Sequence, residues 1–278
     1  WTFSAPSVFM MYHRTVGGAD RENEELTECI PYYYQLSNGH GSGAEHAFQA
    51  ELFYERGQII NADISNHIAM NNARIKDQFS IMVNSKILSM RMAIFNGSWD
   101  KIEECSVSFG KLLMDEKQYI LINTMDIGLC YIYSLLEHPE SAPEWIFGGG
   151  LSDENIMFPA IPMFYTFHNQ LLLAKKEWVE VVARNNEYIE INRVYNNVMC
   201  QIWLHIHQSA ALEKLCKHDD SIAELTRALD LAVPDNIIMP FVENEAYIKN
   251  ILKEIREEGI YVENIEHILN LSEKFRRG

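Results

Sequence analysis

Histidine, serine and paired acidic residues are the side chains whose types and spacing bear on chemistry in this sequence. His205 and His207 are of a metal-ligand type, but residues two apart on a helix diverge by about 200°, whereas a shared ion needs i,i+4 spacing. The Gly-x-Ser-x-Gly motif of a nucleophilic serine is absent. Adjacent carboxylates such as Glu103-Glu104 point to different sides of a helix, and we interpret them as surface charge. The sequence therefore predicts no metal, no cofactor and no catalytic residue.

The five cysteines are scattered, without a Cys-x-x-Cys pair or zinc-type spacing. We interpret an odd number of such residues as reduced core thiols of a cytosolic protein. They are Cys29, Cys105, Cys130, Cys200 and Cys216.

The segment from residue 31 to 45 offers a different kind of chemistry. Three consecutive tyrosines precede Asn38-Gly39-His40-Gly41, and they cannot all face one side of a helix. Glycine N–H groups without a Cβ allow close approach of an anion or a sugar. A connection that needs glycine only for its geometry is the alternative interpretation. The candidate binding residues here are Tyr33, Tyr34, Asn38 and His40.

Composition limits the partners. The chain has 23 Lys and Arg against 39 Asp and Glu, a net charge of −16, which argues against direct contact with a nucleic-acid backbone. No apolar run approaches the roughly eighteen residues of a membrane helix, and Trp1–Ser4 lacks a signal pattern. We expect a cytoplasmic location and no membrane contact. The first residue, Trp1, and the last three, Arg276-Arg277-Gly278, indicate a piece of a longer protein.

A short motif recurs at intervals of about forty residues and predicts the elements that must position these side chains. The interval is 40 residues from Gly57 to Gly97 and 41 from Lys176 to Lys217. Each copy starts with Gly or Lys. A large apolar residue such as Trp99 usually follows two positions later, and a small or aliphatic one such as Ala62 five positions later. Helix-like runs flank each copy. A fixed period in this range is typical of helical-repeat arrays.

The arrangement resembles tetratricopeptide repeats with lengthened helices. We therefore predict an all-α, right-handed superhelix of tetratricopeptide-like (TPR-like) hairpins, a single domain over residues 1–278 with an internal break near 138–160. The third pair lacks a clear second helix. The expected helices are Val8–Arg14, Asp20–Leu36, Ala44–Arg56, Ile59–Lys76, Phe79–Phe95, Trp99–Met114, Tyr119–Leu136, Pro162–Ala174, Trp178–Ile191, Asn197–Cys216, Ser221–Ala232, Met239–Glu257 and Glu263–Phe275.

Repeat arrays bind ligands along the concave surface formed by the first helix of each pair. We count back from each turn in steps of helical spacing to find the residues of the first helix that face this concave surface. They include polar residues among apolar ones, as in binding sites for small molecules or peptides. A polar face without a ligand is the alternative interpretation. The candidate groove residues are Glu51, Asn84, Arg91, Thr124, Tyr131, Thr166, Gln170 and His207.

Two stretches resemble a known family. The sequence from Ala228 to Glu245, with an "ALxLA…P" helix end followed by a "PF…E" helix start, resembles the last repeat of MalT-like, LuxR-type transcriptional regulators. The segment Pro31–Glu45 is similar to one found in related regulators. The resemblance implies a helical-repeat sensor region without the ATPase and the DNA-reading helix-turn-helix domain of such a regulator.

We therefore expect a non-catalytic sensing region for an unknown small-molecule effector or protein, which reaches DNA only through the missing helix-turn-helix domain. The alternatives are a peptide-binding adaptor of the tetratricopeptide kind and an enzyme on a helical toroid. Self-association is also expected, through an apolar face that residues 1–9 would expose.

Overall fold

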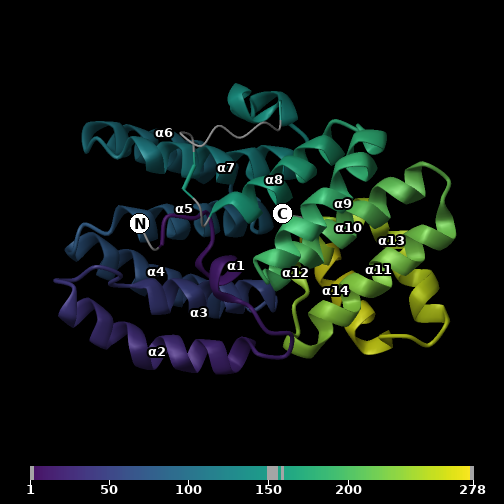
Figure 1. The fold of residues 1–278 in the computed structure, drawn as a ribbon, viewed down its shortest axis with the longest axis horizontal. Coiled ribbons are helices and arrows are strands. Elements are labelled where there is room, and N and C mark those ends of the chain that lie inside the picture. The colour runs from purple at the N-terminus through teal and green to yellow at the C-terminus, as the bar shows by residue number, and fades with distance from the viewer. Residues whose placement is uncertain (1–2, 149–155, 158–159, 276–278) are drawn as a thin grey trace.

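The computed structural model describes residues 3–148, 156, 157 and 160–275, and every regular element in these ranges is a helix (Figure 1). This confirms the predicted all-α class. No helix in the described ranges is both long and apolar enough to cross a membrane.

The helices follow the predicted ranges closely. They are α1 (Val8–Tyr12), α2 (Ala19–Leu36), α3 (Ala44–Glu55), α4 (Ile59–Ile75), α5 (Phe79–Phe95), α6 (Trp99–Asp115), α7 (Tyr119–Leu135), α8 (Ile161–Ala174), α9 (Trp178–Val194), α10 (Val198–Lys214), α11 (His218–Ala232), α12 (Met239–Glu243), α13 (Glu245–Glu257) and α14 (Val262–Phe275).

Most of these helices form two layers. The inner helices α3, α5, α7, α8 and α10 each contact the next along the chain. The outer helices α4, α6, α9 and α11 each pack on the inner helix that precedes them. Figure 1 shows α2 to α7 on one side of the molecule and α9 to α14 on the other.

One kind of turn ends nearly every helix. Its last residue has a left-handed conformation, as at Gly57 (φ 72°) and Gly97 (φ 66°). The next N–H then bonds a carbonyl five residues back, as from Gln58 to Phe53 at 2.8 Å, which satisfies carbonyls that a helix end leaves unpaired. Left-handed residues recur every twenty positions, at 57, 77, 97, 117 and 137 and again at 176, 196, 216 and 236. The helices between these turns have 12 to 17 residues, and most have 17.

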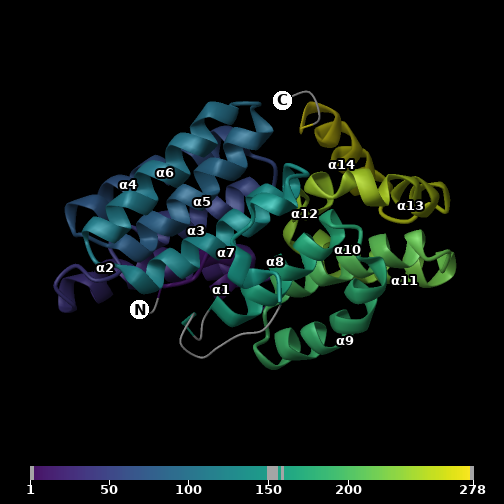
Figure 2. The same cartoon turned by 90° about the horizontal axis from the view of Figure 1, so that it is seen from above.

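The C-terminal part of the chain returns to the first helical pair. The N–H of Ile238 donates to the carbonyl of Glu55 at 2.8 Å, and Arg56 Nε donates to the carbonyl of Asp235 at 2.9 Å. The rings of Phe95 and Phe275 lie 5.9 Å apart between centroids. In Figure 2, α12 and α14 accordingly lie near the ends of α3 and α5.

Two predicted features differ in detail. The predicted helix Met239–Glu257 is divided at Asn244 into α12 and α13. Asn244 has a φ of −109° and its side-chain amide donates to the carbonyl of Pro240. In the predicted break, Pro139–Ser141 and Glu144–Ile146 are single 3-10 turns. The glycines from 149 on in this break lie outside the described residues.

Gly128 fixes the close approach of the inner helices α5 and α7. A Cβ on Gly128 would lie 2.4 Å from Cδ1 and 2.6 Å from Cγ1 of Ile87. Ile87 is buried, so it has little room to shift. A glycine in a helix interior costs about 1 kcal/mol relative to alanine. The cost is offset here because the two helices can pack together.

We predict that Gly128→Ala destabilises the chain by about 1–2 kcal/mol, because overpacking outweighs the gain in helix propensity. Gly110→Ala is the matched control: Gly110 is also inside a helix, but no described residue lies within 4 Å of its added Cβ. The control should stabilise by about 0.5–1 kcal/mol. Urea unfolding of dilute protein measures both. Equal effects of the two substitutions would show that α5 and α7 are not in close contact at Gly128.

Candidate functional site

The eight predicted groove residues are all buried, each with no more than 5% of its surface exposed. They do not line an open groove, because two segments of the same chain lie against the inner helices. One segment is Phe3–His13, which includes α1, and the other is Ile237–Glu243, which includes α12. This covering could not be predicted from local sequence patterns, because it depends on contacts between distant parts of the chain.

Arg91 lies at the centre of the buried polar residues. From α5, its Nη1 donates to Glu55 of α3 at 2.6 Å. Its Nε and Nη2 donate to the two carboxylate oxygens of Glu243 at 3.1 and 2.8 Å. Tyr54 and Tyr131 also donate their hydroxyls to Glu243, at 2.7 and 2.6 Å. One carboxylate from α12 is therefore held by α3, α5 and α7 together.

Aromatic rings surround the guanidinium. The Cζ of Arg91 lies 4.4 Å from the ring centroid of Tyr54, 5.6 Å from that of Tyr131 and 5.8 Å from that of Trp203. Such ring faces attract a cation, more strongly when water is excluded. Trp203 belongs to α10, so the cluster reaches across the inner layer. We call Arg91, Glu55, Glu243, Tyr54, Tyr131 and Trp203 the Arg91 cluster.

The charges of this cluster do not balance when all groups are ionised, since one guanidinium faces two carboxylates. Burial raises the pKa of Glu55 to about 7, although Arg91 acts in the opposite direction. The nearby carboxylates keep the pKa of Arg91 well above its usual value despite burial. Arg91 is therefore always charged, while Glu55 takes up a proton near neutral pH.

Glu51, another predicted residue, binds the start of α1. Its carboxylate accepts from the hydroxyl of Ser7 at 2.5 Å and from the N–H groups of Val8 and Phe9 at 3.1 and 2.6 Å. A carboxylate at a helix N-terminus satisfies N–H groups that have no partner in the helix. Burial nevertheless raises the pKa of Glu51 to about 7.

Asparagine amides bind the same segment through its backbone. Asn84 donates to the carbonyl of Ala5, and Asn197 donates to that of Met10 at 2.7 Å. Residues 3–9 are buried by these contacts. The expectation that they expose an apolar face for self-association is therefore wrong for these residues.

The other predicted groove residues do not join the Arg91 cluster. Gln170 and His207 bond each other at 2.6 Å, and burial lowers the pKa of His207 to about 3, so this histidine is neutral. Thr124 and Thr166 donate to carbonyls of their own helices. His205 and His207 diverge as predicted, since His205 instead pairs with Glu224 at 2.6 Å.

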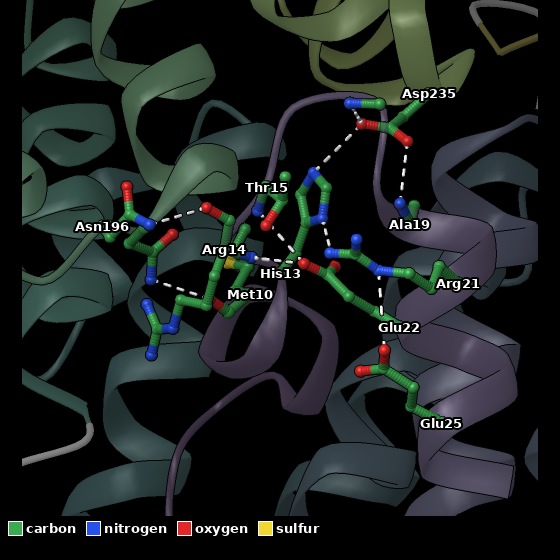
Figure 3. Close-up of polar contacts among 12 residues, drawn as sticks. Met10, His13, Arg14, Thr15, Ala19, Arg21, Glu22, Glu25, Asn196 and Asp235 are labelled. Carbon is green, nitrogen blue, oxygen red and sulfur yellow. Dashed lines mark hydrogen bonds and ion pairs between the residues drawn. The ribbon is translucent and has the colours of Figure 1, made fainter.

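A second buried cluster, which sequence reasoning missed, holds His13 between two carboxylates (Figure 3). Its Nδ1 lies 2.7 Å from Glu22 and its Nε2 lies 3.4 Å from Asp235. Glu22 also accepts from the N–H groups of Arg14 and Thr15, and Asp235 from those of Gly17 and Ala19. No local pattern could indicate it, because Asp235 is 222 residues from His13.

Burial lowers the pKa of His13, but its interactions with Asp235 and Glu22 outweigh it, and the net shift is upward. Although burial acts to raise them, the pKa values of Glu22 and Asp235 are lowered, chiefly by their interactions with His13. The three groups therefore act as a buried ion triad that joins the N-terminal segment to the end of α11.

The second candidate site is only partly assembled. His40 lines a surface pocket of about 450 Å³ together with Asp77 and Gln78, which the sequence did not single out. Tyr33 packs edge-on against His40, with 5.9 Å between ring centroids. Tyr34 is half-buried against the core, and Asn38 is exposed with a left-handed conformation. Of the four predicted residues, only His40 faces the pocket.

A further pocket, of about 550 Å³, lies on the outer side of the molecule between α9, α10 and α11. It contains charges of both signs, including Arg193, His205, Glu224 and Arg227.

No group of three or more metal-ligating side chains occurs in the described ranges. No protein-family model, curated protein or solved structure matches the chain.

We predict that Arg91→Met destabilises the chain by about 3–5 kcal/mol, because it leaves buried carboxylates without their cation. Arg184→Met is the matched control, since Arg184 pairs with Glu180 at the surface, where such pairs contribute at most about 1 kcal/mol. Urea unfolding at pH 7 measures the difference. Equal losses in the two variants would contradict the central role of the Arg91 cluster.

The His13 triad predicts a pH dependence. Because the folded pKa of His13 exceeds its usual 6.5, its contribution is complete below pH 6.5 and is lost as pH rises through the folded value. The raised pKa values of Glu51 and Glu55 add a cost that grows from their usual 4.5 to about 7. Stability should therefore be lower at an alkaline pH, above the raised pKa of His13, than at about pH 6.

The variant His13→Asn isolates the histidine. The free energy of unfolding that His13→Asn loses relative to the native chain should be larger at about pH 6 than at an alkaline pH. His67→Asn serves as the control because His67 is exposed. Urea unfolding at both pH values decides the matter, and a loss for His13→Asn that is independent of pH would rule out a protonated triad.

Proposed function

We propose that this chain is the non-catalytic sensing region of a cytoplasmic transcription regulator similar to the MalT-like, LuxR-type proteins, and that it responds to a small molecule or a partner protein. The observation that carries the proposal concerns the stretch on which the resemblance rests. Its Pro240-Phe241 helix start forms α12, and its acidic residue Glu243 is the carboxylate held by Arg91, Tyr54 and Tyr131.

The proposed mechanism is a population shift between a closed and an open state. In the closed state described above, α1 and α12 cover the inner helices. Glu51 holds α1 and Glu243 holds α12 through hydrogen bonds to defined partners. These hydrogen bonds are formed in the closed state and broken in the open state. An effector that binds the open state better would uncover the inner helices, and the coupling free energy would equal its preference for that state.

We also propose that the helical pairs form a right-handed superhelix of TPR-like hairpins with a period of about forty residues. Support comes from the left-handed turn residues at twenty-residue spacing and from helices of 17 residues such as α4, α5, α6 and α7. Two such helices and their turns make a repeat of the expected length.

The second candidate function is a peptide-binding adaptor. The inner surface already holds a segment of chain through its backbone, by Asn84 at Ala5 and Asn197 at Met10. Side-chain amides that bind backbone groups accept many sequences, as peptide-binding surfaces do. A partner peptide would in this case replace Phe3–His13.

We predict that an effector found by thermal shift loosens the covering segments. The screen uses sugars, glycosides, aromatic acids and short peptides, and a compound at about 100 times its Kd should add about 2.7 kcal/mol of stability. Hydrogen exchange of amides in residues 3–13 and 239–243 should then become faster while exchange in α5 stays slow. Amides of α4 serve as the internal control.

Each outcome separates the two functions. A metabolite that stabilises the chain and speeds exchange in both covering segments supports the sensor. Binding by peptides alone, with faster exchange in residues 3–13 only, supports the adaptor. A bound metabolite that leaves exchange in both segments unchanged would contradict the opening mechanism.

A further inference from the structure

The outer layer has a gap after α6. Inner helices α3, α5, α8 and α10 are each followed by an outer helix, but α7 is followed, in the described ranges, by 3-10 turns and then by α8. The side of α6 that points toward the next outer position therefore has no helix of the described chain beside it. This side is distinct from the one that α6 turns toward α4, where Ser98 and Lys101 line a pocket with Ile60 and Ile64.

Apolar side chains gather on that side of α6. Trp99 is 52% exposed, Val107 67% and Met114 55%. Together with Glu103 and Gly110 they follow one another at steps of three and four residues, so they share one face of the helix. Ile102, Phe109 and Leu113, by contrast, are buried against the neighbouring helices. The helix is thus apolar on two faces, and the fold covers only one.

Gly110 gives an independent indication that another backbone approaches here. It lies inside the helix, where glycine costs about 1 kcal/mol relative to alanine. No atom of the described residues lies within 4 Å of the Cβ that another residue would carry, so packing within the described part of the chain does not require glycine. Small residues on a helix surface allow a second helix to come close.

Glu103 and Lys111 form a self-complementary pair of charges on this face, which also carries the exposed Asp100. Glu103 lies four residues before Val107 and Lys111 four residues after it. Both are exposed, and neither forms an ion pair with another described residue. In an antiparallel pair of identical helices centred on Val107, Glu103 of each helix meets Lys111 of the other. Trp99 of each then lies near the Met114 end of the other.

We propose that α6 packs antiparallel against α6 of a second copy of this chain, about a twofold axis at Val107. The same patch serves both copies, as a twofold interface requires. A helix of 17 residues is about 25 Å long, so the contact belongs to the small, transient class of interfaces. It brings together two copies whose inner surfaces and covering segments remain separate from the interface.

A charge exchange tests this arrangement by sedimentation velocity at protein concentrations up to about 0.5 mM, in the range where weak complexes form. The native chain should associate reversibly. Glu103→Lys and Lys111→Glu should each weaken self-association at least tenfold, because each places like charges opposite each other. A mixture of these two variants should associate as well as the native chain, since opposite charges then face each other at both positions.

Two further variants keep the test independent of folding. Gly110→Gln should reduce association at least tenfold without lowering the melting temperature, because its side chain has free space in the single copy. Glu257→Lys, an exposed change of equal charge on α13, should leave association unchanged. A native chain that stays monomeric at 0.5 mM, or a mixture of Glu103→Lys and Lys111→Glu that does not associate, would overturn the proposal.

Discussion

One buried cation determines how this molecule is put together. Arg91 has a permanent charge that cannot remain in the interior without partners, and its partners come from α3 and α12. The carboxylate of Glu243 is in turn completed by tyrosines of α3 and α7. The C-terminal segment must therefore return to the first pairs, and the path of the chain from α8 to α12 has to allow it.

The helices and their ends could be predicted because their causes are local. Turns such as Gly57 and Gly97 mark helix ends in the sequence, and Lys176 and Glu137 adopt the same left-handed conformation without glycine. The apolar periodicity then locates each helix between turns. The division at Asn244 escaped prediction because an amide bond to Pro240 is a matter of geometry rather than periodicity.

The candidate site was predicted only in part. Helical spacing selected Arg91, Tyr131 and Glu51, and the structure shows all three buried on the inner helices. It could not show that α1 and α12 cover them, nor that Glu243 and His13 belong to the same interior. Those residues acquire their roles only after parts of the chain some 150 to 220 residues apart come together, and no short pattern records such a contact.

The backbone bond from Ile238 to Glu55 changes how the molecule loses its structure. A linear repeat array can unravel from either end, because each repeat depends only on its neighbours. Here the last helices rest on the first, so neither end can fray without disturbing the other. Unfolding is thus expected to be cooperative across the whole chain. Folding must wait for a contact across 183 residues, which makes the closing step late and slow.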